Sequence, residues 1–182
     1  MAGNFDDEHT LREVANRYFE NACRCLKDDG YVQFVNFVRI QDGEVPVILS
    51  DDDGNIVTDK DAIELVMRSM APRCIWIAQI AEAWTLMNAE TYNPTMAVSQ
   101  HPDRAEGIFV NVQSRQGTYM ITSVFKRDEQ GNPLKPIIQG ESFVSHNDST
   151  QILHGRMTNY YHDTLSTTNN ENNENIAWYV QK

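Results

Sequence analysis

A run of thirteen residues, Cys74–Leu86, is rich in isoleucine, alanine and tryptophan and contains neither proline nor glycine. In an extended chain, alternate side chains point to opposite faces, and both faces of this run are mostly apolar. That pattern is typical of a strand buried on two sides. The run therefore predicts the central strand of a sheet, with the rest of the chain arranged around it.

Glu82 is the exception within this predicted strand, because it places a carboxylate between Ala81 and Ala83. Burying a carboxylate without a partner costs roughly several kcal/mol. We therefore expect Glu82 to meet a cation or several hydrogen-bond donors, or else to be protonated.

A candidate polar cluster joins Glu82 to the segment that precedes the next predicted strand. Consecutive strands usually lie side by side, and this pairing predicts that Arg104 approaches Glu82 and forms a bidentate ion pair. Two interpretations stay open: a ligand-binding or active site, or a structural ion pair that holds down the long connection 87–104. The six candidate residues are Glu82, Trp84, His101, Asp103, Arg104 and Glu106.

The remaining segments predict an α+β fold. A capping pattern at Thr10 and Glu13 and an apolar stripe at helical spacing predict a first helix that ends at Gly30, and a second helix follows Thr58. Two strands lie between the helices, and a meander of strands follows Leu86. We expect a mostly antiparallel sheet with the two helices packed on one face. The predicted strands are 31–40, 45–49, 74–86, 107–114, 118–127, 134–144 and 151–161.

Residues 1–165 are predicted to form a single α+β domain, and residues 166–182 a polar, asparagine-rich tail. Within this tail, the segment 176–180 is apolar and strand-prone. It can return as an edge strand or add to the sheet of a neighbouring subunit, and a homodimer is one expectation.

The charge of the chain disfavours direct binding of nucleic acid. The net charge is −11, and residues 1–65 hold fifteen acidic and six basic side chains, whereas nucleic-acid-binding proteins normally carry a basic surface.

Three cysteines do not suggest a disulfide framework, and no apolar run has the roughly 20 residues of a membrane helix. We expect a cytoplasmic protein that does not bind a membrane.

No pattern for a cofactor or metal is found in the sequence. Asp51, Asp53 and Asn55 suggest a calcium-binding loop, but position 6 of such a loop would be Ile56 and position 12 would be Ala62. Neither a P-loop nor a dinucleotide-binding glycine motif occurs. We therefore expect no cofactor and no metal.

Two short motifs give a resemblance to a known family. A strand ends in Ala81-Glu82-Ala83-Trp84, and the segment His101-Pro102-Asp103-Arg104-Ala105-Glu106 precedes the next strand. Gly30-Tyr31 opens a strand before them, and Arg127-Asp128 closes the hairpin after them. Over about residues 28–133 the chain resembles a family of uncharacterised small proteins of bacteria and their phages. The resemblance implies an α+β domain and no particular reaction, cofactor or catalytic residue.

Together these observations favour a small acidic accessory protein of bacterial or phage origin that binds a protein or a small ligand and has no catalytic activity of its own. The alternative is a small hydrolase, or another enzyme acting on small molecules, that uses Glu82 as acid or base with His101 or Arg104 on the substrate.

Overall fold

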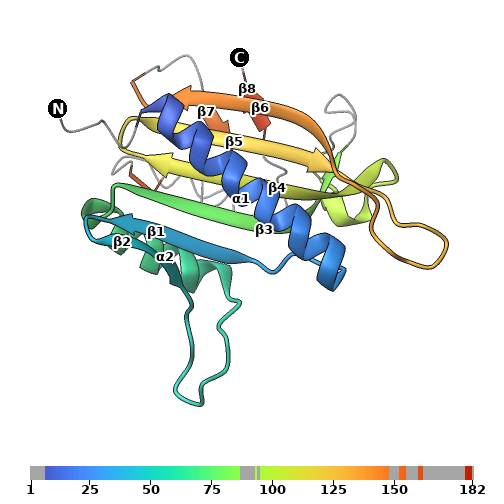
Figure 1. Ribbon diagram of the computed structural model, residues 1–182, viewed down its shortest axis with the longest axis horizontal. Helices are drawn as coiled ribbons and strands as arrows, with labels where there is room; N and C mark the ends of the chain where they lie inside the picture. The colour runs from blue at the N-terminus through green and yellow to red at the C-terminus, as the bar shows by residue number, and fades with distance from the viewer. Residues whose placement is uncertain are drawn as a thin grey trace.

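The computed structural model describes residues 7–86, 93, 95–147, 152–154, 160–161 and 179–181 (Figure 1). Two helices and six long strands make up most of it. Two short 3₁₀ helices and a small two-stranded sheet complete it. In chain order the elements are α1 (Glu8–Asp29), β1 (Val35–Ile40), β2 (Gly43–Val47), α2 (Lys60–Met70), η1 (Ala71–Arg73), β3 (Trp76–Leu86), η3 (Val98–Gln100), β4 (Arg104–Ser114), β5 (Gly117–Val124), β6 (Ile137–Ser145), β7 (Ile152–His154) and β8 (Tyr179–Gln181).

The six-stranded sheet is antiparallel throughout, in the order β2-β1-β3-β4-β5-β6. Strand β3 lies inside this sheet and pairs with β4 along its whole length, from Trp76 opposite Ser114 to Leu86 opposite Arg104. The predicted α+β class and the predicted position of the 74–86 strand inside the sheet are confirmed.

Helix α1 covers one face of the sheet with the apolar stripe that the sequence predicts. Its buried residues pack against β3, β4 and β5 and include Leu11, Phe19 and Leu26. The N-cap of the helix is Asp7, whose side chain accepts a hydrogen bond from the Thr10 amide at 2.8 Å. The predicted cap, Thr10, is therefore wrong, because the helix begins about one turn earlier in the chain.

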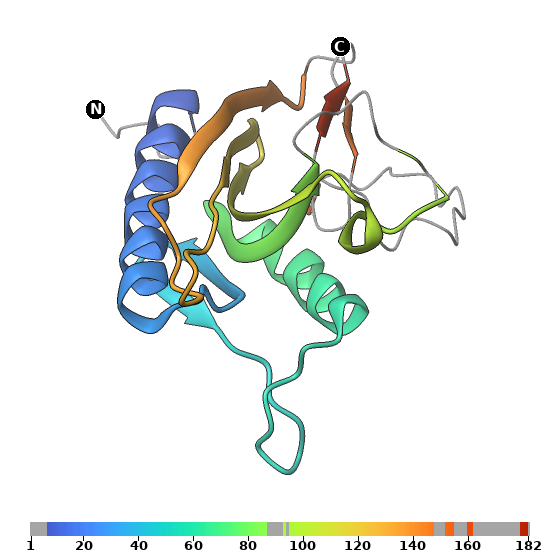
Figure 2. The ribbon, with the colours of Figure 1, turned by 90° about the vertical axis from the view of Figure 1, so that its right-hand side faces the viewer.

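Helix α2 lies on the opposite face of the sheet, as Figure 2 shows. Strand β1 gives the reason: Phe37 packs with the α1 core, whereas its neighbour Val38 packs with Ile63 and Met67 of α2. The prediction that both helices pack on one face is therefore wrong. A sheet that is apolar on both faces needs a cover on each, and a single layer of helices would leave Val38 and Ile77 exposed to water.

The end of the chain returns to its own fold. Residues 179–181 form β8, which pairs antiparallel with β7 in a separate two-stranded sheet. This pairing is within the chain, and β8 does not extend the six-stranded sheet. The predicted boundary at residue 165 and the asparagine-rich segment 166–175 lie outside the described residues. Within the described part, neither helix combines the length and the apolar composition needed to cross a membrane.

Candidate functional site

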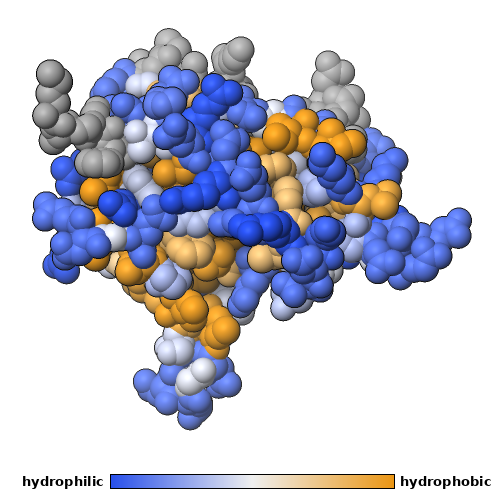
Figure 3. Space-filling model, viewed as in Figure 1, coloured by the Kyte–Doolittle hydropathy of each residue, from blue (hydrophilic) through white to orange (hydrophobic). Residues whose placement is uncertain are grey.

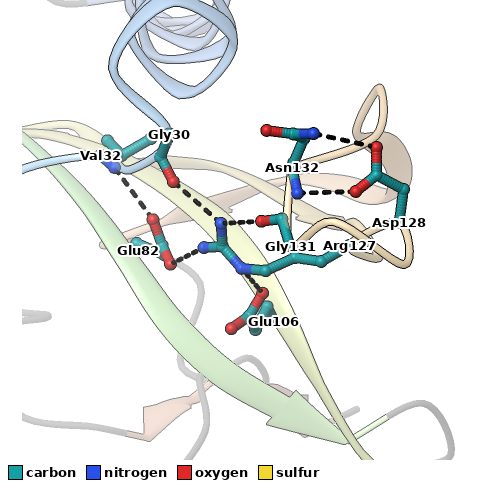
Figure 4. Close-up of polar contacts among 8 residues, drawn as sticks. All are labelled: Gly30, Val32, Glu82, Glu106, Arg127, Asp128, Gly131 and Asn132. Carbon is teal, nitrogen blue, oxygen red and sulfur yellow. Dashed lines mark hydrogen bonds and ion pairs between the residues drawn. The ribbon is translucent and has the colours of Figure 1, made fainter.

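Glu82 is held in a cluster of charged side chains with Glu106 and Arg127, here called the Arg127 cluster (Figure 4). Arg127 Nη2 lies 3.2 Å from Glu82 Oε1, and Arg127 Nε donates to Glu106 Oε2 at 2.8 Å. The side chains are only 21–30% exposed, so water screens these charges weakly. The cluster connects β3, β4 and the segment that follows β5.

Arg127 also binds backbone oxygens, which ties two further segments to the cluster. Its Nη1 donates to the carbonyl of Gly30 at 3.0 Å and to that of Gly131 at 3.4 Å. Gly30 ends α1 in the left-handed conformation, with φ of 81°. The other oxygen of Glu82 accepts the Val32 amide at 2.9 Å. The cluster therefore fixes the end of α1 and the 128–132 turn to the sheet.

The expectation that Glu82 has a cationic partner is confirmed, but the prediction that this partner is Arg104 is wrong. In the β3–β4 register, Glu82 lies opposite Ile108 while Arg104 lies opposite Leu86. Four residues of a strand span about 13 Å, too far for a direct ion pair. Arg127 follows β5, which pairs with the edge of β4 opposite β3, and its side chain extends across β4 to Glu82.

Arg104 instead packs on Trp84. Its guanidinium carbon lies 4.8 Å from the centroid of the Trp84 ring, in cation–π geometry, and it also donates to the carbonyl of Ser99. The Trp84 side chain is 40% exposed. This pair holds the loop before β4 against the end of β3.

His101 and Asp103 form a local turn at the start of β4. His101 is buried, and its Nδ1 accepts a hydrogen bond from the Asp103 amide at 3.1 Å. Because Nδ1 is the acceptor, the neutral imidazole carries its proton on Nε2. The Asp103 side chain is exposed.

A hollow of about 840 Å³ surrounds the start of β1, between the two helices. Its walls come from α1, the residues before and within β1, the segments 47–49 and 56–58, α2, the end of β3 and η3. Large apolar side chains dominate the lining. They include Phe34, Phe37, Ile63, Met67 and Trp84.

Of the six predicted residues, only Glu82 and Trp84 are among the described residues that line this hollow. Part of this apolar lining is exposed at the surface of the molecule. Figure 3 shows hydrophobic residues gathered over β1, β2 and the base of the hairpin at 48–57, where Ile48 and Ile56 are 65% and 55% exposed.

The shifted pKa values do not favour nucleophilic or base chemistry. Burial raises the pKa of the Cys23 and Cys74 thiols, which keeps them protonated. Burial also raises the pKa of Tyr18 and Tyr160. Among the described residues, no group of three or more histidine, cysteine, aspartate or glutamate side chains could hold a metal ion. The arrangement is suited to holding a ligand by shape and by apolar contact.

Two residues, Arg127 and Asn36, were not predicted as residues of the site. Arg127 follows the fifth strand, and its partners come from residues 30, 82, 106 and 131, so no spacing in the sequence indicates them. Asn36 lines the hollow from β1 and is buried. The only signal for Asn36 was a polar residue inside a run of valine and phenylalanine.

No model of a known protein family, no curated protein and no solved structure matches this chain. The resemblance to small bacterial and phage proteins therefore stays a prediction.

Proposed function

We propose that this protein works by binding a small, mostly apolar molecule in the hollow between α1, β1 and α2. The observation that carries the proposal is the hollow itself. Its volume of about 840 Å³ falls within the range of roughly 300–1,000 Å³ common for small-molecule sites, and aromatic and aliphatic side chains dominate its lining. Between the two expected classes of partner, this observation favours a small ligand over a protein.

The Arg127 cluster supports this proposal by giving the hollow a fixed wall. Both oxygens of Glu82 accept hydrogen bonds, one from Arg127 and one from the Val32 amide. Glu82 and Val32 both line the hollow. A pre-formed wall lowers the conformational entropy lost on binding.

The geometry gives less support to the alternative of an enzyme that uses Glu82. An acid or base must reach the substrate together with the groups that position it. His101 and Arg104 are not among the described residues that line the hollow, and Arg104 stacks on Trp84. We therefore favour a structural role for Glu82 and binding as the activity.

The experiment is a titration with N-phenyl-1-naphthylamine, an uncharged dye whose fluorescence rises in apolar sites. The proposal predicts saturable binding to the folded chain. The variant Ala83→Phe places a ring in the hollow and should weaken binding by about tenfold or more.

The matched control is Ala105→Phe, the same substitution on the neighbouring strand. Ala105 lies opposite Thr85 and is half-buried, but it does not line the hollow. It should bind the dye within about twofold of the unmodified chain. Equal weakening in both variants, or no saturable binding at all, would contradict the proposal.

A further inference from the structure

Strand β1 loses its outer neighbour at the place where the hollow lies. Strand β2 pairs with β1 only as far as Asn36, whereas β3 pairs with it as far as Val35. Beyond Val47 the chain leaves the sheet and forms the hairpin at 48–57, which projects below β2 in Figure 1. Among the described residues, the start of β1 therefore has a strand beside it on the β3 side only. We call residues 33–35 the open edge.

The β1–β2 register shows which backbone groups the open edge presents. In an antiparallel pair of strands, opposite residues alternate between pairs that exchange two hydrogen bonds and pairs that exchange none. Pro46 has no amide hydrogen and lies opposite Phe37, so this pair exchanges none. The adjacent pair, Asn36 with Val47, therefore exchanges two. Phe34 is two residues before Asn36, so its N–H and C=O point to the same side of β1, away from β3.

The residue that would continue the β1–β2 ladder is bonded elsewhere. The same register would place Leu49 opposite Phe34, but the Leu49 carbonyl accepts the Val57 amide at 2.8 Å within the hairpin. No hydrogen bond joins the N–H or the C=O of Phe34 to another group in the part of the chain that the structure describes. Phe34 and Leu49 both line the hollow, and Phe34 is 39% exposed. A backbone donor and a backbone acceptor therefore point from Phe34 toward the hollow.

These two backbone groups define the ligand group that suits them. The N–H needs an acceptor and the C=O needs a donor, spaced as in the next strand of an antiparallel sheet. One residue of an extended peptide supplies both from its own C=O and N–H, and such strand addition is a common mode of peptide recognition. The walls beside the open edge suit apolar side chains, because they include Ile48 and Ile56 of the hairpin and Ile63 of α2.

We propose that the ligand of the hollow is a short apolar peptide that adds a strand to the open edge at Phe34. This inference rests on the proposed function and names the chemical class of its ligand. One residue of the peptide donates its N–H to the Phe34 carbonyl and accepts the Phe34 N–H with its own carbonyl. The three residues of the open edge span about 10 Å, so the paired segment of the ligand is about three residues long.

The test compares two uncharged probes by isothermal titration calorimetry of the full chain. The first is 1-naphthoyl-leucine methylamide, which joins an apolar body to one peptide residue. In the second, an ester oxygen replaces the leucine N–H, so the probe keeps its shape but cannot donate this hydrogen bond to the Phe34 carbonyl. The unmodified protein should bind the first probe about tenfold more tightly than the second.

Phe34→Pro removes the N–H that the open edge presents. Phe34→Leu is the matched control, because it changes the same side chain but keeps the N–H. Phe34→Pro should bind the first probe about tenfold less tightly than Phe34→Leu does.

Hydrogen exchange on the unmodified protein gives a measurement that stands even if Phe34→Pro does not fold. A saturating concentration of the first probe should slow exchange of the Phe34 amide by about tenfold or more. The amide of Tyr31 should be unchanged, because Tyr31 is 59% exposed and is not among the described residues that line the hollow.

The outcomes separate this inference from the proposed function. Equal binding of the two probes, or an unchanged exchange rate at Phe34, overturns the inference while the hollow remains a binding site. Equal affinities of Phe34→Pro and Phe34→Leu for the first probe overturn it as well. If neither probe binds but N-phenyl-1-naphthylamine does, the inference fails and the proposed function stands. If that dye does not bind either, the proposed function itself fails.

Discussion

Replacing Arg127 by Met tests whether the Arg127 cluster holds the fold together. The variant keeps an apolar stem but leaves the carboxylates of Glu82 and Glu106 without their cation. Breaking a buried ion pair costs about 3–5 kcal/mol, whereas an exposed pair contributes about 0–1 kcal/mol. These side chains are 21–30% exposed, between the two limits, so we expect the free energy of unfolding to fall by about 2–3 kcal/mol.

Urea denaturation followed by circular dichroism measures this loss, and thermal unfolding should show a midpoint lower by about 4–12 °C. Arg104→Met is the control, because Arg104 is exposed and makes only a cation–π contact with Trp84 and a hydrogen bond to the Ser99 carbonyl among the described residues. It should cost less than about 1 kcal/mol. Adding Glu82→Gln and Glu106→Gln to Arg127→Met should recover part of the stability. Equal losses for Arg127→Met and Arg104→Met would refute the reasoning.

Three other perturbations give separate tests by urea denaturation. Gly107→Ala should destabilise by about 1–3 kcal/mol, because its Cβ would lie 2.2 Å from the Ser123 carbonyl oxygen. Gly140→Ala, whose nearest atom is 3.6 Å away, should change stability by less than about 0.5 kcal/mol. A hydrogen bond from the Asn132 amide lowers the pKa of the Asp128 carboxyl from its ordinary value of 3.8. The ionised carboxylate therefore stabilises the folded state above pH 3.8, and this stabilisation is lost as the pH falls through the lower pKa of the folded state. Asp128→Asn should therefore weaken the acid dependence of the urea midpoint, and an unchanged dependence would contradict this. Burial, with a hydrogen bond to Glu141, raises the pKa of Tyr119 from 10.0 to about 12. The protonated Tyr119 hydroxyl therefore contributes fully to the stability of the folded state below pH 10.0, and this contribution is lost as the pH rises through about 12. Between pH 10.0 and about 12, Tyr119→Phe should lose less stability than the unmodified chain.

The elements that depend on local patterns could be predicted from the sequence. The apolar stripe of α1 and the two-sided apolar run of β3 each indicate which side chains are buried, because the side-chain period follows directly from helix or strand geometry. The same run also showed that Glu82 needs a partner.

The parts that depend on register and on which face is covered could not be predicted. Arg104 is closer to Glu82 in sequence than Arg127 is, yet the β3–β4 register displaces Arg104 along the strand. Only the pairing of β4 with β5, and the path of the chain after β5, brings Arg127 to Glu82. Similarly, the period of α2 shows that one side is buried but not which face of the sheet it meets.

Three buried amide side chains, one on each of β1, β3 and β4, illustrate the same limit. Asn36, Gln79 and Asn111 are far apart in sequence, and each is a polar residue with apolar neighbours on both sides. Strand pairing alone aligns them, with Asn36 opposite Gln79 and Gln79 opposite Asn111.

The central claim is that the hollow between α1, β1 and α2 binds a small apolar molecule. Methyl-labelled NMR spectra recorded during a titration with 1-naphthol test this claim most directly. The account predicts saturable shifts for the methyl groups of Ile63 and Met67, which line the hollow, and unchanged signals for Ile137, which is exposed on β6. Shifts at Ile137 without shifts at Ile63 and Met67, or no saturable shift anywhere, would contradict it.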